Sequence, residues 1–445
     1  MAPLSTRSKF LLVLLVLLAA SEFIERGPLR FLQATDFNDF ISPYLQSRAL
    51  VEGLDPYSPE VVVRLWPSGE AYRPDFLDKD LADGSLMEKR GVPTAYPPTC
   101  LLLLTPLAVL PWPVAHLAWL VITVVLTLGA IWSLLAMSGF ERSDWRFYGF
   151  VAFALALAPL HTGLAAGSIV ISTVALCGIA LSLEQCGGEM VAGILFGIAV
   201  CLKPQIGLPF LAFYLLRRRW RLSGIAAGVF FATALLAMVR LAISGTPWIQ
   251  NYRLDNKVLL ATGMLSDFTE RNPIRFGLIN LQVLLYVIWH HAMAANVLAL
   301  AISAALFGVW VFLVLRNGSL DVLLAVSTLV VLSLFPVYHR FYDGFLLILP
   351  LGWSLREFSG PGNKLARGAF LLLLPFLVPG GSALEQLQLS GRIPEAMAQS
   401  WYWTGIVMPH QIWFLLLLSL LLLWRMADGG RARAFAIAPH NMPSV

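Results

Sequence analysis

The chain has 445 residues, of which 58% are hydrophobic and 13% are charged, and its formal net charge is +5 at pH 7. A soluble domain needs about 25% charged residues to cover its surface, so this composition excludes an ordinary soluble protein and indicates a polytopic membrane protein. Basic residues of such proteins gather on the cytoplasmic face, and nothing in the charge pattern indicates nucleic-acid binding.

Twelve apolar segments predict an all-α polytopic helical bundle that forms one membrane domain over residues 1–445. The expected spans lie at 10–24, 98–110, 113–137, 148–160, 163–183, 190–216, 222–243, 292–315, 320–336, 344–355, 366–379 and 404–424. Residues 98–243 thus hold spans two to seven, and residues 292–424 hold spans eight to twelve. Because a perpendicular helix needs about 20 residues to cross the bilayer, several spans are short and need a thinner bilayer or shelter behind other helices.

The basic residues indicate how these spans are oriented. With twelve spans and a cytoplasmic N-terminus, the main basic clusters fall on the cytoplasmic side, as the positive-inside rule expects. These clusters are Arg217–Arg221, Arg316, the group Arg356, Lys364 and Arg367, and the C-terminal tail 425–445. Arg142 and Arg146 fall on the outer side and count against this orientation. The same parity places outside the loops 25–97, 244–291, 339–343 and 380–403.

The first outer loop contains the stretch TDFNDFISPYLQSRALVEGLDPY, residues 35–57. This stretch predicts a helix. The apolar stripe is formed by Phe40, Tyr44, Ala49 and Leu50, and the stop signal is Gly53 followed by Asp55-Pro56. We expect this helix to lie on the membrane surface, with Asp36 and Asp39 at its start. Carboxylates in that place are candidates for chemistry at the boundary of water and lipid. The alternative is that one of them only caps the helix.

Metal-binding patterns in the chain are weak. Asp78-Lys79-Asp80 has the spacing of a motif that binds a divalent cation on a nucleotide sugar, but two carboxylates alone make a poor site for a hard cation. A solvated charged loop explains them as well, and we therefore expect no metal. The four cysteines lack the spacing of a disulfide framework or a metal site, which predicts small core side chains.

Lys203 is a charged residue inside an apolar segment, within Leu202-Lys203-Pro204-Gln205. A lysine in the membrane is costly and marks a functional cavity by default. The alternative is that 190–216 is two short helices, with Lys203 reaching water at the boundary between them.

An ordered set of motifs along the chain resembles glycosyltransferase family 87 (the DUF2029 group) of the GT-C class. The motifs are Asp39-Phe40 ahead of Gly53-Leu54-Asp55-Pro56-Tyr57, Tyr96-Pro97-Pro98 with Pro106 and Pro111, Lys203-Pro204-Gln205 ahead of Arg217–Arg221, and Pro336 to Tyr342. That family includes mannosyltransferases that use polyprenyl-phosphate mannose. The chain departs from the family at Gly167-Ser168, where Gly-Gln is frequent.

The resemblance implies an inverting transfer of mannose or a related sugar from a polyprenyl-phosphate donor to a lipid or glycan acceptor, without a cofactor, nucleotide or metal. It implies an active site on the outer face of the cell membrane, whereas the cytoplasmic termini follow from the twelve-span parity. It further implies that Asp39 is the catalytic base, with Asp36 as the second candidate. The expected substrate contacts are His339 and Arg340 at the phosphate, and then Lys203, Tyr57, Tyr96 and Tyr342. The alternative for His339 and Arg340 is a pair of anchors at the membrane interface.

A lipid or sugar-lipid transporter is the alternative function. Such a protein is also polytopic, but related halves and charged residues at the midplane are typical of it. Here the polar residues gather in outer loops, and no two related halves are recognisable in the sequence. A purely structural membrane subunit would not need the carboxylates of the first loop.

Overall fold

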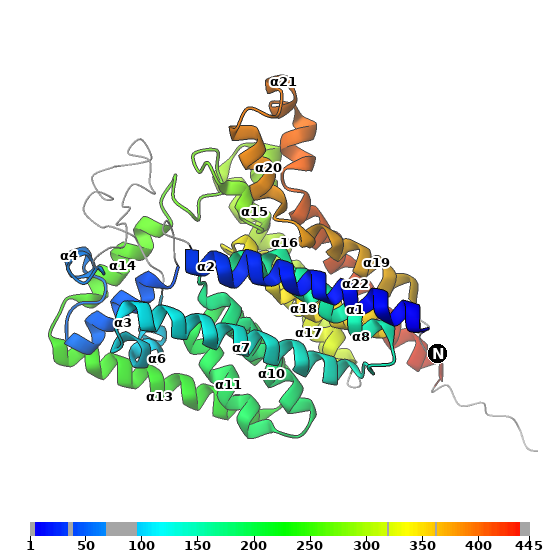
Figure 1. The fold of residues 1–445 in the computed structure, drawn as a ribbon, viewed down its shortest axis with the longest axis horizontal. Coiled ribbons are helices and arrows are strands. Elements are labelled where there is room, and N and C mark those ends of the chain that lie inside the picture. The colour runs from blue at the N-terminus through cyan, green and yellow to red at the C-terminus, as the bar shows by residue number, and fades with distance from the viewer. Residues whose placement is uncertain (1–4, 34–38, 68–95, 318–319, 361–362, 437–445) are drawn as a thin grey trace, which may run out of the picture.

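The computed structural model describes residues 5–33, 39–67, 96–317, 320–360 and 363–436, which form helices and no β-strand (Figure 1). The expected all-α class is therefore confirmed. Five segments of the described chain are long and apolar enough to cross a membrane: α7 (Trp112–Ser138), α13 (Trp220–Ser244), α16 (Ala292–Arg316), residues Lys364–Leu389, and residues His410–Asp428 of α22 (His410–Ala436). The bent pair α8 (Trp145–Ala156) and α9 (Ala158–Ala165) gives a sixth if it is one span. The expected count of about twelve spans is not confirmed.

Helix boundaries follow the proline and glycine signals of the sequence. α7 begins after Pro111 and ends before Gly139, whose φ of 68° is a left-handed value that glycine adopts without strain. The other α-helices described are α1 (Thr6–Ile24), α2 (Arg30–Gln33), α3 (Ile41–Glu52), α4 (Pro59–Arg64), α6 (Pro98–Ala108), α10 (Ile169–Gln185), α11 (Glu189–Leu202), α12 (Pro204–Leu216), α14 (Trp248–Leu259), α15 (Leu281–Trp289), α17 (Val322–Ser333), α18 (Ile348–Glu357), α19 (Asn363–Leu373), α20 (Gly380–Leu389) and α21 (Glu395–Ala398). Short 3-10 or π-helical turns are η1 (Glu25–Leu29), η3 (Arg275–Gly277), η4 (Phe341–Leu347), η5 (Leu374–Leu377) and η6 (Trp403–Val407).

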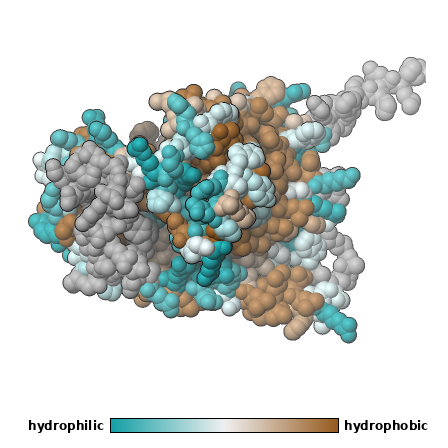
Figure 2. Space-filling model, turned by 90° about the horizontal axis from the view of Figure 1, so that it is seen from above, coloured by the Kyte–Doolittle hydropathy of each residue, from teal (hydrophilic) through white to brown (hydrophobic). Residues whose placement is uncertain are grey.

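Apolar side chains are exposed along the outer faces of the long helices. Val125 on α7, Phe231 on α13 and Val297 on α16 are 62%, 67% and 58% exposed. In Figure 2 a broad hydrophobic area lies between the hydrophilic residues near the centre of the view and those at its right edge. Soluble proteins rarely expose large apolar patches, whereas a surface in contact with lipid is apolar. The chain is therefore a multi-pass membrane protein.

α3 occupies the place that the sequence predicts, but its surroundings differ from the prediction. It ends at Gly53, whose φ is 76°, as the stop signal indicates. Eight of its 12 residues are buried, so it is packed within the protein rather than lying on a membrane surface. Its start is covered by aromatic rings of α7, since the ring centroid of Phe40 lies 4.8 Å from that of Trp119.

α6 does not cross the bundle, although a span was expected at 98–110. It has 11 residues, and a helix of that length is about 16 Å long, roughly half the thickness of a bilayer core. Both of its ends contact the first loop. The Tyr44 hydroxyl donates to the carbonyl oxygen of Leu110 (2.8 Å), and the Tyr57 hydroxyl donates to that of Tyr96 (3.0 Å). Figure 1 shows α6 beside α3. The chain therefore enters and leaves α6 on the same side of the bundle.

Two helices that fold back on each other replace the single span expected at 190–216. Lys203 has an extended backbone (φ −147°, ψ 91°) and separates α11 from α12. The ring centroids of Phe196 and Tyr214 lie 5.3 Å apart, so α12 returns along α11. Gly207 permits this close approach, because a Cβ there would lie 2.6 Å from a backbone nitrogen of α11. The chain therefore traverses this part of the bundle twice, which confirms the two helices of the alternative. Lys203 does not reach water at their boundary, because its side chain is only 14% exposed and lies 3.6 Å from Asp343.

The bundle has two ends, which we call the loop end (α3, α4 and α14, at the left of Figure 1) and the basic end (the side of the N-terminus, at the right). α7 and α10 run parallel from the loop end, because Thr123 bonds Ser172 (2.9 Å) and Ser182 bonds the carbonyl oxygen of Ser133 (3.0 Å). Their last residues therefore lie together at the basic end. Arg219 joins them there through an ion pair of 2.8 Å with Glu184, the residue before the end of α10.

The turn between α7 and α8 lies on the opposite side from the one expected. Arg146 donates to the carbonyl oxygen of Arg356 (3.1 Å), and Trp145 packs edge-on against Phe358. Arg146 and Arg356 therefore share the basic end, whereas the twelve-span parity had separated them. The cause is α6: because it does not cross the bundle, the turns that follow it lie at the end opposite to the one expected. A second crossing at α11–α12 then restores the expected side from residue 217 onward.

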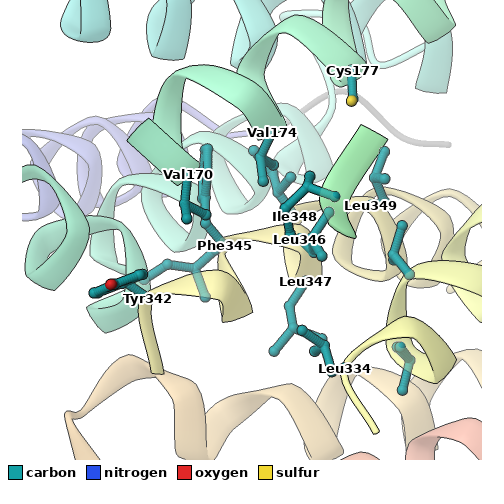
Figure 3. Packing of buried hydrophobic residues seen from close by; sticks show 14 of the residues in the cluster. Val170, Val174, Cys177, Leu334, Tyr342, Phe345, Leu346, Leu347, Ile348 and Leu349 are labelled. Atoms are coloured by element: carbon teal, nitrogen blue, oxygen red, sulfur yellow. The ribbon is translucent and has the colours of Figure 1, made fainter. Parts of the chain in front are cut away.

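The core of the bundle fixes the position of η4. Val170 and Val174 of α10 lie against Phe345 and Ile348 on and beside η4 (Figure 3), and Phe345 is fully buried. Tyr342 lies at the edge of this cluster. The apolar side of η4 is thus held by α10, which leaves the residues at its start available for polar contacts at the loop end.

Candidate active site

Asp343 is the centre of a cluster of charged groups at the loop end. It lies in the first turn of η4, and its side chain is 1% exposed. Its Oδ2 accepts hydrogen bonds from Nδ1 of His339 and from the backbone N–H of Arg340, both at 2.9 Å. Its Oδ1 lies 3.6 Å from Nζ of Lys203. The turn between α11 and α12 and the start of η4 are therefore joined, although 140 residues of sequence separate them.

The surroundings of Asp343 keep its carboxylate ionised. Burial by itself raises its pKa, but the charge of Lys203, the hydrogen bond and charge of His339 and the N–H of Arg340 together hold the pKa below its usual range. Among the described residues, Nε2 of His339 has no hydrogen-bond partner, and the His339 side chain is fully buried. A buried ring nitrogen without a partner costs free energy, so this atom is available to a bound molecule.

Asp39 lies beside this cluster. Its backbone N–H donates to the carbonyl oxygen of Ala166 (2.6 Å), in the turn that precedes α10. Burial raises the pKa of its carboxyl group, although the positive charges of Arg340 and Lys203 and a hydrogen bond with Tyr342 oppose that rise. Oδ2 of Asp39 is buried and has no hydrogen-bond partner among the described residues.

The capping interpretation is wrong for Asp39. The residue at the N-cap of α3 is Phe40, and among the described residues no side-chain hydrogen bond caps that helix. The carboxylate of Asp39 therefore lacks the usual structural explanation. Asp36, the second candidate base, lies outside the described residues.

Tyrosine side chains surround the carboxylate and the two cations. The Tyr342 ring centroid lies 5.7 Å from Nζ of Lys203 and 5.9 Å from the guanidinium carbon of Arg340. Burial raises the pKa of Tyr338 to about 12 and that of Tyr96 well above its usual value, and the charge of Asp39 acts in the same direction on both. These hydroxyls remain protonated at neutral pH and can therefore donate hydrogen bonds.

Tyr57 contacts Tyr96 and makes none of the contacts with the charged groups of the cluster that are described above. Its hydroxyl donates to the carbonyl oxygen of Tyr96, and its ring packs against Tyr252 (centroids 4.9 Å apart). The neighbouring Asp55 accepts hydrogen bonds from the Tyr57 N–H (2.9 Å) and from Nδ2 of Asn251 (2.7 Å). Within the described residues, the Asp55-Pro56-Tyr57 motif thus ties the first loop to α14.

The loop formed by residues 244–291 contacts the segment that carries His339 and Arg340. The backbone N–H of Ile279 donates to the carbonyl oxygen of His339 (3.0 Å), and Leu278 forms an isolated antiparallel bridge with Arg340. Nε2 of Gln282 donates to the carbonyl oxygen of Pro336 (2.8 Å). Sequence reasoning missed this support because nothing in the loop's composition distinguishes it from other polar loops.

Sequence reasoning also missed Tyr338 as a site residue and gave Asp343 no role of its own. Both lie within four residues of His339, inside a polar run between two apolar segments. The separation of four residues between His339 and Asp343 was the sequence feature that could have indicated their pairing. It becomes meaningful only once η4 turns the two side chains toward each other.

No metal centre is formed by the described residues, which contain no group of three or more His, Cys, Asp or Glu side chains able to hold an ion. Asp78-Lys79-Asp80 lies outside the described part of the chain. Three of the cysteines are buried and free, whereas Cys186 is exposed.

Comparison with known proteins identifies a family. The family model described as glycosyltransferase family 87 matches residues 94–350, which is more than half of the chain. The matched region includes Lys203 and the segment from Tyr338 to Asp343, and it begins after Asp39. No curated protein and no solved structure matches the chain at a significant level.

Proposed function

The chain belongs to glycosyltransferase family 87, and from this premise we propose that it transfers a sugar from a polyprenyl-phosphate donor to a lipid or glycan acceptor with inversion at the anomeric carbon. The donor sugar is mannose or a related hexose. One observation carries the proposal: a buried carboxylate with no capping role, Asp39, lies beside two cations, Lys203 and Arg340, at one end of a membrane bundle.

Asp39 is the base of this reaction. The acceptor oxygen attacks the anomeric carbon from the face opposite the phosphate, and its proton passes to Asp39. The bond from the anomeric carbon to the phosphate oxygen breaks, and its electron pair leaves with the polyprenyl phosphate. A base works best when its pKa approaches the working pH, and burial moves the pKa of Asp39 in that direction.

Lys203 and Arg340 stabilise the leaving phosphate. Positive groups fixed in advance around developing negative charge lower the barrier of such a displacement. Arg340 offers a planar fork of donors that matches phosphate oxygens, and Lys203 offers a point charge. Asp343 holds Lys203 and orients His339, whose Nε2 is the remaining donor or acceptor for the substrate.

The loop end faces the extracytoplasmic side of the cell membrane in this proposal, and both termini are cytoplasmic. Support comes from the basic end, where Arg146, Arg219 and Arg356 gather. Basic residues are retained on the cytoplasmic side, so the opposite end, with Asp39 and Asp343, faces outward.

Transfer by the purified protein tests this function. The protein is reconstituted in liposomes and incubated with a panel of polyprenyl-phosphate sugars and membrane-lipid acceptors, and each donor is followed by mass spectrometry. Consumption of one donor with formation of a glycosylated product is expected. If labelled lipid instead crosses the bilayer while no new bond forms, the transporter alternative is correct.

The assignment of His339 and Arg340 to the leaving phosphate has its own test. A charge-assisted hydrogen bond contributes about 1.5–3 kcal/mol, so Arg340→Ala should weaken donor binding or slow transfer at least about tenfold. His339→Ala should also slow transfer. Unchanged donor kinetics in both variants would place the phosphate elsewhere.

A further inference from the structure

A recess lies away from the charged cluster, at the corner where α13 meets α14. Its volume is about 470 Å³, within the range of sites for small ligands. It is lined by Thr246, Pro247, Trp248, Ile249, Gln250 and Arg253. None of these residues has a role in the transfer described above.

The recess opens next to the surface that faces lipid. α13 is one of the helices able to cross a membrane, and its last turns expose Leu236, Val239 and Ile243, the last of these 74% exposed. Trp248 and Ile249 follow directly, and Ile249 is 47% exposed. Tryptophan beside the end of a transmembrane helix is typical of the interface between lipid chains and headgroups. The recess therefore lies at the depth of lipid headgroups.

Its polar lining favours an anion. Arg253 is exposed and forms no ion pair with any residue that the structure describes. Gln250 and Thr246 add an amide and a hydroxyl. A guanidinium and neutral donors around a headgroup-sized space suit a phosphate group, which the arginine fork binds through two oxygens.

We propose that this recess binds the phosphate-bearing headgroup of an anionic membrane phospholipid, with Arg253 on the phosphate and the exposed side chains of α13 along the acyl chains. The occupant is a lipid rather than a soluble phosphate because the apolar surface of α13 continues into the recess.

The helix that carries part of the recess, α14, also contacts the first loop. Asn251 of α14 donates to Asp55, and Tyr252 packs on Tyr57, whose hydroxyl holds the backbone of Tyr96. Tyr96 in turn is among the tyrosines whose pKa reflects the charge of Asp39. α14, which carries Gln250 and Arg253 of the recess, therefore also contacts the Asp55-Pro56-Tyr57 motif of the first loop.

Binding of a labelled lipid tests the assignment. Purified full-length protein in a non-ionic detergent is titrated against fluorescent phosphatidic acid, and binding is followed by anisotropy. Loss of a charge-assisted contact predicts that Arg253→Ala weakens binding at least about tenfold. Lys257→Ala is the matched control, because Lys257 is an exposed cation on the same helix that does not line the recess; its affinity should stay within about twofold of wild type.

Competition distinguishes the sources of phosphate. Short-chain phosphatidic acid should displace the probe, whereas inorganic phosphate and short-chain diacylglycerol should not. Equal binding by Arg253→Ala and wild type overturns the proposal, as does an equal loss in Lys257→Ala or displacement by inorganic phosphate at the concentration of the lipid. No sugar transfer enters this measurement, so its outcome does not depend on the proposed function.

Discussion

The ammonium of Lys203 lies 3.6 Å from Oδ1 of Asp343, and this pair joins the turn between α11 and α12 to the start of η4. The two side chains are 14% and 1% exposed, so water screens the pair weakly. A lysine at a break within apolar helices needs such a partner. Asp343 holds His339 with its other oxygen, so one carboxylate positions groups from two distant segments.

The pair should show energetic coupling. Lys203→Met leaves a buried carboxylate with one cation fewer, and Asp343→Asn leaves Lys203 without its partner, so each should lower the free energy of unfolding by about 1–3 kcal/mol. The double variant should lose less than the sum, because the interaction can be lost only once. Thermal unfolding of the four proteins in detergent measures this. Additive shifts of the midpoint would mean that the two side chains do not interact.

Asp39→Asn should separate catalysis from stability. Loss of a general base lowers the transfer rate by about 10²–10⁴-fold while donor binding persists. Because Asp39 does not cap α3, the unfolding midpoint should remain close to that of wild type. Glu52→Gln is the control, since Glu52 is an exposed carboxylate at the end of α3, the helix that follows Asp39, and pairs only with Arg48 among the described residues. If Asp39→Asn transfers sugar at the wild-type rate, Asp39 is not the base, and Asp36→Asn tests the second candidate.

The pH dependence of transfer should report Asp39. The base must be deprotonated, so kcat/KM falls as the pH decreases through the pKa of Asp39. Burial raises that pKa, which places the acid limb above the ordinary carboxyl value of 3.8. Arg340 lowers the same pKa, so the residual activity of Arg340→Ala should have its acid limb at a higher pH than wild type. An unmoved limb would show that a different group titrates.

The turn that places Lys203 depends on a glycine. A methyl group at Gly207 would lie 2.6 Å from the backbone of α11, so Gly207→Ala should separate α11 from α12 and destabilise the protein by about 1–3 kcal/mol. Gly228→Ala is the matched control in α13, because a Cβ at Gly228 meets no atom within 4 Å. Unfolding midpoints in detergent compare the two. Equal midpoints would argue against the close packing of α11 and α12.

Cysteine labelling tests which turns share an end of the bundle. On a background without the native cysteines, an impermeant reagent on intact cells should label Lys257→Cys and spare Arg142→Cys and Asp428→Cys until the cells are permeabilised. Labelling of positions 257 and 142 together would contradict the ends described above. Labelling of 142 and 428 without 257 would keep the arrangement of the helices and reverse the orientation in the membrane.

The local features of this protein follow from its sequence. The all-α class follows from the many apolar segments along the chain, and the end of α3 follows from Gly53, whose φ of 76° strains other residues. Lys203 stood out because a charge in an apolar run needs an explanation. Each of these inferences uses neighbours within a few residues, where the physics is set by backbone geometry and by the cost of a charge in lipid.

The tertiary structure alone decided which apolar segments cross the bundle and which polar groups meet. Hydropathy assigns a span to α6 because its residues are apolar, yet α6 is short and packs beside α3. It assigns one span to residues 190–216, yet Phe196 meets Tyr214 because Gly207 lets the chain turn back. The partnership of Lys203 with Asp343 likewise arises from segments 140 residues apart. Such contacts depend on packing among distant helices, which no local pattern of residues encodes.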